Sequence, residues 1–325
     1  MKTFKKILLT FFALLLLICF AVYFYFVYKI TPDPNQLSIK ENLINTPFEW
    51  VSIPTNKGLD SNGAMLVPVY LKGCQKRFYM QFDIGHPTTI FYKCLLDKIN
   101  SKYHNIPYQQ KSDKVYLSGF DFFINESLVN AKKISAMDCT VSNFSWDDST
   151  SKIIIGTIGS DIIENEILMI DYPLSKIYIG NNILDSLPSN TKFSEFKFKY
   201  RRILLPSIVG EEKKDIFFDS GTSAFELMTD MDSWHKLAKK GAPINTFDIN
   251  NWGKKWIVHS VATDDSIRLN STTLPLRNVT YVDGPGILLK LVYKISGVGG
   301  LTGNKLFLNK KIILDTKRLK FAIFN

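Results

Sequence analysis

The chain has 325 residues, of which 46% are hydrophobic and 22% charged, and its formal net charge at pH 7 is +10. This length and apolar content predict a folded protein with a substantial core and exclude an intrinsically disordered chain. The basic residues are scattered and form no dense tract interleaved with aromatics, so the composition argues against a nucleic-acid-binding protein.

The first segment of interest, from Ile7 to Tyr28, is apolar and carries no charged residue. A helix of this length is enough to cross the ~30 Å hydrocarbon core of a bilayer. Three lysines precede it, which by the positive-inside rule keeps the N-terminus in the cytoplasm and exports the rest of the chain. We therefore expect residues 1–30 to be a cytoplasmic stub and a single-pass signal-anchor helix that attaches the protein to the membrane through residues 7–28. A cleaved signal peptide is the alternative.

The next segment, residues 31–47, is rich in Pro and Asn and is predicted to be a tether. From Phe48 onward, short apolar runs alternate with Gly, Asn, Asp and Pro, a pattern typical of many β-strands and few helices. Residues 88–100 and 231–241 are the exceptions and are predicted to be helical.

An internal repeat organises the rest of the chain. The segment "GTIGSDIIENEILMIDYPLSKIYI" from Gly156 aligns without gaps with "GLTGNKLFLNKKIILDTKRLKFAI" from Gly300, at an offset of 144 (300 − 156). In this alignment Gly159 falls on Gly303. The sequence therefore predicts an all-β protein made of two duplicated lobes, residues 48–190 and 191–325, and such a duplication makes a monomer sufficient.

Two aspartates occupy matching places in this repeat. "YMQFDIGHPTTIFY" sets Asp83 in an apolar, strand-like run, and "DIFFDSGTSAFEL" sets Asp219 in another, 136 positions later (219 − 83). Each aspartate alone is well explained as a turn or helix cap. If the lobes are related by a pseudo-twofold axis, however, the two carboxyl groups face each other and share a proton. Such a pair can activate a water molecule for attack on a peptide carbonyl.

These motifs resemble the pepsin-like aspartic peptidases, the family of the pepsin and retropepsin fold. The resemblance is carried by "FDIG" at 82–85, "FDSGTS" at 218–223, "TIG" at 157–159 and "LTG" at 301–303. It implies a bilobal pepsin-like acid protease fold and an endopeptidase that hydrolyses polypeptides without a cofactor or metal. The residues it implies are catalytic Asp83 and Asp219, supporting Gly85, Ser220, Gly221, Thr222, Gly159 and Gly303, and Tyr116 on a flap. For Tyr116, an ordinary strand tyrosine is the alternative.

Two positions depart from the family pattern, which has a hydroxyl residue after each Asp and after each Gly. Ile84 stands at the first of these positions and removes a cross-lobe hydrogen bond, a loss of about 1 kcal/mol. His86 stands at the second, and its ring, if it points inward, lowers the pKa of Asp83. A second function therefore stays open: a peptidase-like protein of weak or no activity that binds peptides or a partner in the cleft between the lobes.

The cysteines and histidines give weaker indications. Outside the first segment, Cys74, Cys94 and Cys139 allow one disulfide at most, and their spacing does not select the pair. The four histidines show no metal-binding spacing, so no metal site is expected.

Overall fold

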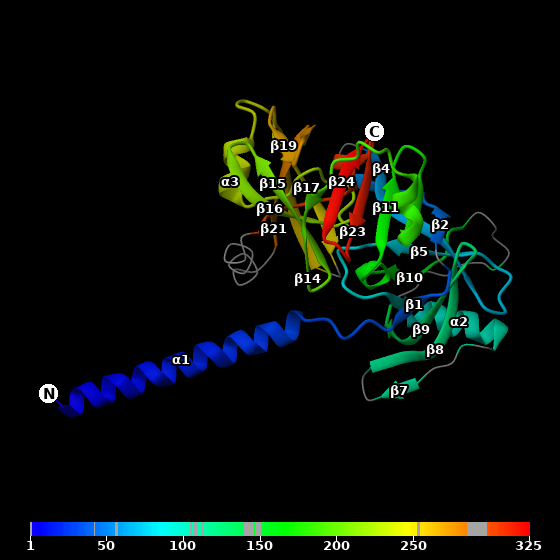
Figure 1. Cartoon of the computed structure of the whole chain (residues 1–325), viewed down its shortest axis with the longest axis horizontal. Helices are drawn as coiled ribbons and strands as arrows, with labels where there is room; N and C mark the ends of the chain where they lie inside the picture. The colour runs from blue at the N-terminus through cyan, green and yellow to red at the C-terminus, as the bar shows by residue number, and fades with distance from the viewer. Residues whose placement is uncertain are drawn as a thin grey trace. The chain divides into compact units, whose positions relative to one another are not determined.

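The computed structural model describes residues 2–41, 43–55, 58–104, 106, 109–111, 114–139, 146, 151–251, 254–284 and 298–325. The chain divides into two compact units, Met1–Pro34 and Asn35–Asn325. The first unit consists mainly of helix α1, Lys2–Ile30, which includes the apolar residues 7–28 (Figure 1). Within the part of the chain that the structure describes, no helix is long and apolar enough to cross a membrane.

The regular structure of the second unit is mainly β-strand, which confirms the predicted all-β class. Its first sheet has the order β1-β9-β6-β10-β5-β4-β8-β7, with β3 paired to β4. Its strands are β1 (Leu37–Ile39), β3 (Glu49–Thr55), β4 (Gly58–Leu71), β5 (Phe78–Phe82), β6 (Ile90–Tyr92), β7 (Gln109–Lys111), β8 (Lys114–Ile124), β9 (Ser127–Met137) and β10 (Ile154–Ile158).

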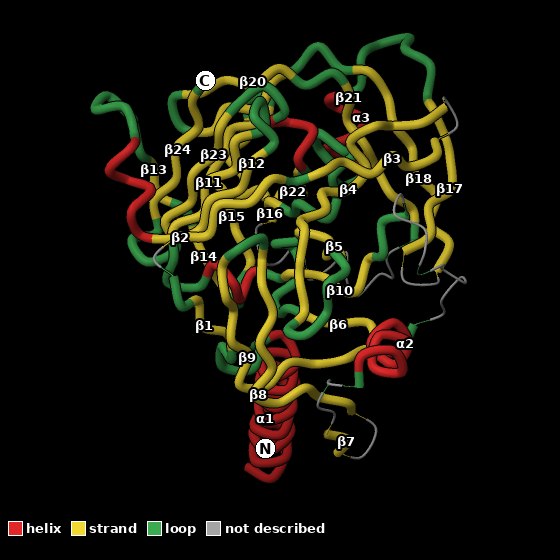
Figure 2. The backbone as a smooth tube through the Cα atoms, turned by 90° about the vertical axis from the view of Figure 1, so that its right-hand side faces the viewer, coloured by secondary structure: helices red, strands yellow, loops and turns green. Residues whose placement is uncertain are grey.

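A second sheet combines strands from distant parts of the sequence. Its strands have the order β13-β24-β23-β11-β12-β2, and Figure 2 shows β24, β23, β11 and β12 running side by side. These strands are β2 (Leu43–Pro47), β11 (Ile167–Asp171), β12 (Lys176–Gly180), β13 (Ser194–Glu195), β23 (Lys311–Asp315) and β24 (Lys320–Phe324). The C-terminal strands therefore lie next to strands from the middle of the chain.

Two further sheets come from the second half of the chain. One has the order β20-β19-β15-β16-β22 with β14 paired to β15, and the other has the order β17-β18-β21. Their strands are β14 (Lys197–Lys199), β15 (Arg202–Val209), β16 (Glu212–Phe218), β17 (Asn245–Asn251), β18 (Lys254–Ala262), β19 (Ser266–Leu269), β20 (Thr272–Pro275), β21 (Asn278–Asp283) and β22 (Val298–Thr302).

The helices of this unit are short. They are α2 (Lys93–Tyr103), α3 (Met231–Leu237) and the 3₁₀ helices η1 (Ser160–Ile163), η2 (Asn181–Ser186) and η3 (Asn304–Phe307). The two predicted helical segments are confirmed by α2 and α3, although Ile90–Tyr92 at the start of the first forms strand β6. A disulfide joins Cys94 of α2 to Cys139, and Cys74 is a buried free thiol.

The predicted tether is wrong over part of its length. Leu37–Ile39 pairs with β9, and Leu43–Pro47 pairs with β12, so both are strands of the folded unit. In β2, Ile44 and Thr46 are buried while their neighbours are exposed, which is the alternation of a half-buried strand. The Asn and Pro content of residues 31–47 concealed this pattern.

The sequence repeat is also a repeat of local structure. β11 and β23 pair antiparallel with Met169 opposite Ile313, two positions that are equivalent at the offset of 144 (313 − 169). The turn after each strand is closed by an aspartate. Asp171 Oδ1 accepts a hydrogen bond from the backbone N–H three residues later at 3.0 Å, and Asp315 Oδ1 does the same at 2.8 Å. The two segments thus meet each other through equivalent residues.

Candidate active site

Each of the two aspartates stands at the end of a buried strand. Asp83 follows β5 and Asp219 follows β16, and these strands pair in parallel with β10 and β22. The backbone N–H of Asp83 donates to the Ile158 carbonyl and that of Asp219 to the Thr302 carbonyl, each at 2.9 Å. Ile158 and Thr302 are equivalent in the repeat (302 − 158 = 144). The same strand pairing therefore positions both aspartates.

The two aspartate loops lie against each other. A Cβ atom added to Gly85 would overlap the carboxyl group of Asp219, and one added to Gly221 would overlap that of Asp83. Glycine is therefore required at both positions for the close approach of the opposite side chain. The two carboxyl groups share a hydrogen bond. The structure thus brings together the two residues that the sequence analysis predicts to be catalytic.

Backbone and hydroxyl donors hold both carboxyl groups in place. One oxygen of each aspartate accepts a hydrogen bond from the N–H of the glycine two residues later, at 3.0 Å for Asp83 and 2.8 Å for Asp219. The second oxygen of Asp219 accepts from the Thr222 hydroxyl at 2.8 Å. At the position equivalent to Thr222, His86 instead donates its backbone N–H to Asp83 Oδ1 at 3.2 Å.

Burial and mutual repulsion keep one proton on the pair. Burial raises the pKa of Asp83, although the hydrogen bond from Asp219 and the backbone N–H groups oppose the increase. Burial and the neighbouring negative charge of Asp83 raise the pKa of Asp219 to about 7. Both residues stay partly exposed, so water can reach them. The arrangement combines a base and an acid at one place, as general acid–base chemistry requires.

Only one of the two residues that follow the aspartates, Ser220, has a side chain that can form hydrogen bonds to the opposite loop. The Ser220 hydroxyl accepts a hydrogen bond from the Ile84 N–H at 3.0 Å and donates to the Phe82 carbonyl at 2.9 Å. The equivalent side chain, Ile84, is fully buried and has no group that can return this contact. The structure therefore lacks the cross-loop hydrogen bond whose loss is expected from Ile84 in the sequence.

The lowered pKa that an inward-pointing His86 would give Asp83 does not occur. The His86 ring makes a local contact instead, with Nδ1 2.5 Å from the Thr88 carbonyl oxygen. Because burial has the largest effect on Asp83, the pKa of this residue is raised.

The remaining predicted residues lie in two places. Gly159 and Gly303 abut the aspartate loops, since a Cβ atom on Gly159 would overlap the Thr88 carbonyl group and one on Gly303 that of Thr222. Tyr116 lies on β8, and Lys133 Nζ is 3.8 Å from its ring centroid. Among the described contacts, none joins Tyr116 to either aspartate.

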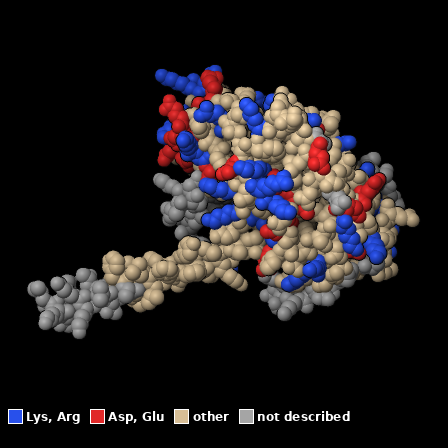
Figure 3. All heavy atoms as spheres, viewed as in Figure 1, with Lys and Arg blue, Asp and Glu red and all other residues tan. Residues whose placement is uncertain are grey.

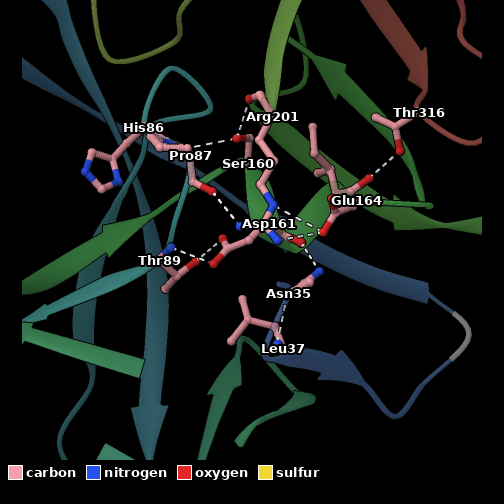
Figure 4. A network of polar contacts seen from close by, with 11 residues as sticks. Asn35, Leu37, His86, Pro87, Thr89, Ser160, Asp161, Glu164, Arg201 and Thr316 are labelled. Atoms are coloured by element: carbon pink, nitrogen blue, oxygen red, sulfur yellow. Dashed lines mark hydrogen bonds and ion pairs between the residues drawn. The ribbon is translucent and has the colours of Figure 1, made fainter. Parts of the chain in front are cut away.

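A buried support behind the Asp83 loop was not predicted from the sequence. The Asp161 carboxylate accepts hydrogen bonds from the Thr89 N–H at 2.7 Å and the Thr89 hydroxyl at 2.6 Å (Figure 4). The same hydroxyl accepts from the Gly159 N–H at 3.1 Å. Burial raises the pKa of Asp161, and the two Thr89 contacts oppose this. The place of Asp161, two residues after the repeated Gly159, is the sequence signal by which it could have been found.

Other features lie apart from the two loops. A cavity of about 480 Å³ is lined by residues of β15, β16 and β19, among them Lys213, Lys214 and Arg268. Figure 3 shows basic and acidic side chains side by side near α3, where Lys236 pairs with Glu212 at 3.0 Å. In the described ranges, no cluster of His, Cys, Asp and Glu is arranged to hold a metal ion.

Comparison with known proteins gives no further assignment. The chain matches no protein-family model and no curated protein. The functional conclusion therefore rests on the residues of the two aspartate loops.

Proposed function

We propose that this protein is an aspartic endopeptidase in which Asp83 and Asp219 activate a water molecule for hydrolysis of a peptide bond. The observation that carries the proposal is the hydrogen-bonded pair of carboxyl groups, each against the glycine of the opposite loop. As the pH falls through about 7 the pair takes up one shared proton. The ionised carboxylate then takes a proton from water, and the protonated partner donates to the carbonyl oxygen under attack.

The proposal extends to the pepsin-like bilobal fold, with lobes at residues 48–190 and 191–325 and a cleft between them for a polypeptide. It is supported by the repeated strand pairing and by the position of both aspartates after equivalent strands. A flap role for Tyr116 and a monomeric state stay predictions.

Location outside the cytoplasm also stays a prediction, as does attachment to the membrane through residues 7–28. The disulfide between Cys94 and Cys139 supports such a location, because disulfides persist in oxidising compartments.

A second candidate function is peptide binding without efficient cleavage. The observation that favours it is Ile84, whose side chain cannot return the hydrogen bonds that the Ser220 hydroxyl makes to the Asp83 loop. Poorly fixed carboxyl groups bind a peptide but hold the attacking water less accurately.

The two candidates are separated by cleavage of an unfolded polypeptide by the full-length protein, measured from about pH 3 to about pH 8. Asp83→Asn and Asp219→Asn are compared with Asp264→Asn, which changes a carboxylate that is 74% exposed and lies outside the loops. We expect wild type and Asp264→Asn to cleave equally and each loop variant to lose at least ~100-fold in kcat. Wild-type activity should fall as the pH rises through about 7, because the pair then loses its shared proton.

Absence of cleavage by the wild-type protein at every pH would contradict the peptidase proposal. Binding of the same peptides by wild type and Asp219→Asn would then support the second candidate.

A further inference from the structure

Arg201 is a buried arginine at an unusual place in the chain. It lies in the tight turn between β14 and β15, where Tyr200 and Arg201 both have left-handed backbone conformations with φ of +52° and +58°. Such a conformation is uncommon for residues other than glycine. Only 4% of the Arg201 residue is exposed. A buried guanidinium is costly unless it is paired and hydrogen-bonded, so its contacts are informative.

The guanidinium is paired with Glu164, which follows η1. Arg201 donates through Nε at 3.1 Å and through Nη2 at 2.8 Å to the same oxygen of Glu164. The Glu164 side chain is 31% exposed, so the pair is buried mainly on the arginine side. These two residues come from different repeats of the sequence, and the ion pair joins them.

From this anchor, two contacts reach the loop that carries Asp83 (Figure 4). Arg201 Nη1 donates to the Pro87 carbonyl oxygen at 3.4 Å. The Arg201 carbonyl accepts from the Ser160 hydroxyl at 2.7 Å, and the Ser160 N–H donates to the His86 carbonyl at 2.8 Å. Residue 86 in turn donates its own N–H to the Asp83 carboxylate at 3.2 Å. Arg201 is thus connected to the carboxylate through a short chain of hydrogen bonds.

The Asp219 loop has an equivalent support of different chemistry. Asn304 occupies the position of Ser160 in the repeat (304 − 160 = 144). Its amide donates to the Ser220 carbonyl at 2.8 Å, and its oxygen accepts from the Tyr172 hydroxyl at 2.7 Å. Each aspartate loop is therefore held from behind by one side chain of the other repeat, Tyr172 for the loop of Asp219 and Arg201 for the loop of Asp83.

We infer that Arg201 is a positioning residue for Asp83, acting through Ser160, His86 and Pro87. The inference rests on the proposed peptidase function. Ser220 of the opposite loop holds the Asp83 loop at the Ile84 N–H and the Phe82 carbonyl, and Arg201 holds the other end of the same loop at the Pro87 carbonyl. Arg201 does not touch the carboxyl groups and takes no direct part in the chemistry.

The first test measures amide hydrogen exchange of the full-length protein, and it requires no activity. The amides of Gly85 and His86 report on the Asp83 loop, because both donate to its carboxylate. We expect Arg201→Met to speed their exchange about tenfold or more, with a smaller change at Gly221. Arg201→Lys, which keeps the charge and loses the paired geometry, should give an intermediate effect.

The control variant is Arg202→Met, which removes the next arginine in the sequence. Arg202 lies on β15 opposite Lys199 and has no described contact with residues 83–89. It should leave exchange at Gly85 and His86 unchanged. Should Arg201→Met fail to fold, Glu164→Gln releases the guanidinium from its partner and gives the same comparison.

The second test separates positioning from a purely structural role. We expect Arg201→Met to lower kcat about tenfold or more with KM nearly unchanged, and Ile84→Thr to restore part of the loss by supplying the missing cross-loop contact. Equal acceleration of exchange at Gly85, His86 and Gly221 would overturn the inference, as would faster exchange without any loss of kcat. A wild-type protein that does not cleave at all would refute the proposed peptidase function, while the exchange comparison would still decide whether Arg201 holds the loop.

Discussion

The backbone N–H of Ser220 has no acceptor within the described residues, although the residue is completely buried. The equivalent N–H in the other loop, that of Ile84, donates to the Ser220 hydroxyl at 3.0 Å. A buried donor without a partner costs about 1–3 kcal/mol. The asymmetry follows directly from the sequence, because the side chain at position 84 carries no oxygen.

Ile84→Thr is therefore expected to stabilise the protein relative to Ile84→Val. Thr and Val have nearly the same shape, so both lose the same packing and differ in the hydroxyl that can accept from the Ser220 N–H. We expect the Thr variant to have the larger free energy of unfolding, by about 1 kcal/mol, measured with denaturant. At an ordinary apolar position the order is reversed, because a buried hydroxyl without a partner is costly. A Val variant that is the more stable of the two would contradict this account of Ser220.

At the scale of single elements, local pattern predicts strands and helices well where the apolar residues are clustered. The apolar run that precedes Asp83 forms the buried strand β5, and the helical segment around α2 buries one face, as their sequence patterns indicate. Strands β1 and β2 were missed because they are short and lie among Asn and Pro. Their partners, β9 and β12, are about ninety or more residues away in the chain, and local propensity contains no information on such a pairing.

The cysteines show the same limit, since their spacing allowed several pairs and the fold selects Cys94 with Cys139. This bond joins α2 to the segment that follows β9 across a sequence separation of 45 residues, with a Cα–Cα distance of 5.7 Å. Closing a loop of this length restricts the unfolded chain and typically adds about 2–4 kcal/mol to the stability.

We expect a Cys94→Ser, Cys139→Ser double variant to unfold at a lower denaturant concentration than the wild type. Its free energy of unfolding should be lower by about 2–4 kcal/mol. Added reductant should lower the stability of the wild type and leave the double variant unchanged, which makes the variant its own control. Alkylation of the unfolded, non-reduced wild type should label the two free cysteines, Cys19 and Cys74, and no others. Labelling of Cys94 or Cys139 before reduction would refute the bond.

For the whole molecule, the repeat was the most informative part of the sequence. The offsets of 144 (300 − 156) and 136 (219 − 83) aligned the segments that contain both aspartates and their glycines, and the structure brings these residues together. The support from Arg201 could not be derived in this way. Arg201 reaches Pro87, 114 residues away, through a turn whose sequence gives no sign of a partner.

A second ion pair connects parts of the chain that are 245 residues apart, β4 and η3. Lys305 Nζ lies 2.6 Å from Asp60 Oδ2, and the two side chains are 25% and 16% exposed. Burial alone raises the pKa of Asp60, but the hydrogen bond from Lys305 and further contacts outweigh it, so the pKa is lowered overall. A carboxylate with a lowered pKa stabilises the folded state above its unfolded pKa, and this contribution is lost as the pH falls through the folded pKa.

Lys305→Met is expected to lower the free energy of unfolding at neutral pH by about 1–3 kcal/mol, because it leaves the Asp60 carboxylate largely buried without its partner. Asp60→Asn combined with Lys305→Met should recover much of this loss, since no buried charge then remains. The difference between wild type and Lys305→Met should shrink as the pH falls below ~4, where Asp60 is protonated in the unfolded chain. Lys239→Met serves as the control, because its pair with Asp264 is exposed and such pairs contribute about 0–1 kcal/mol. A loss in Lys305→Met no larger than in Lys239→Met, or one that is unchanged at low pH, would show that this contact does not stabilise the connection between the two segments.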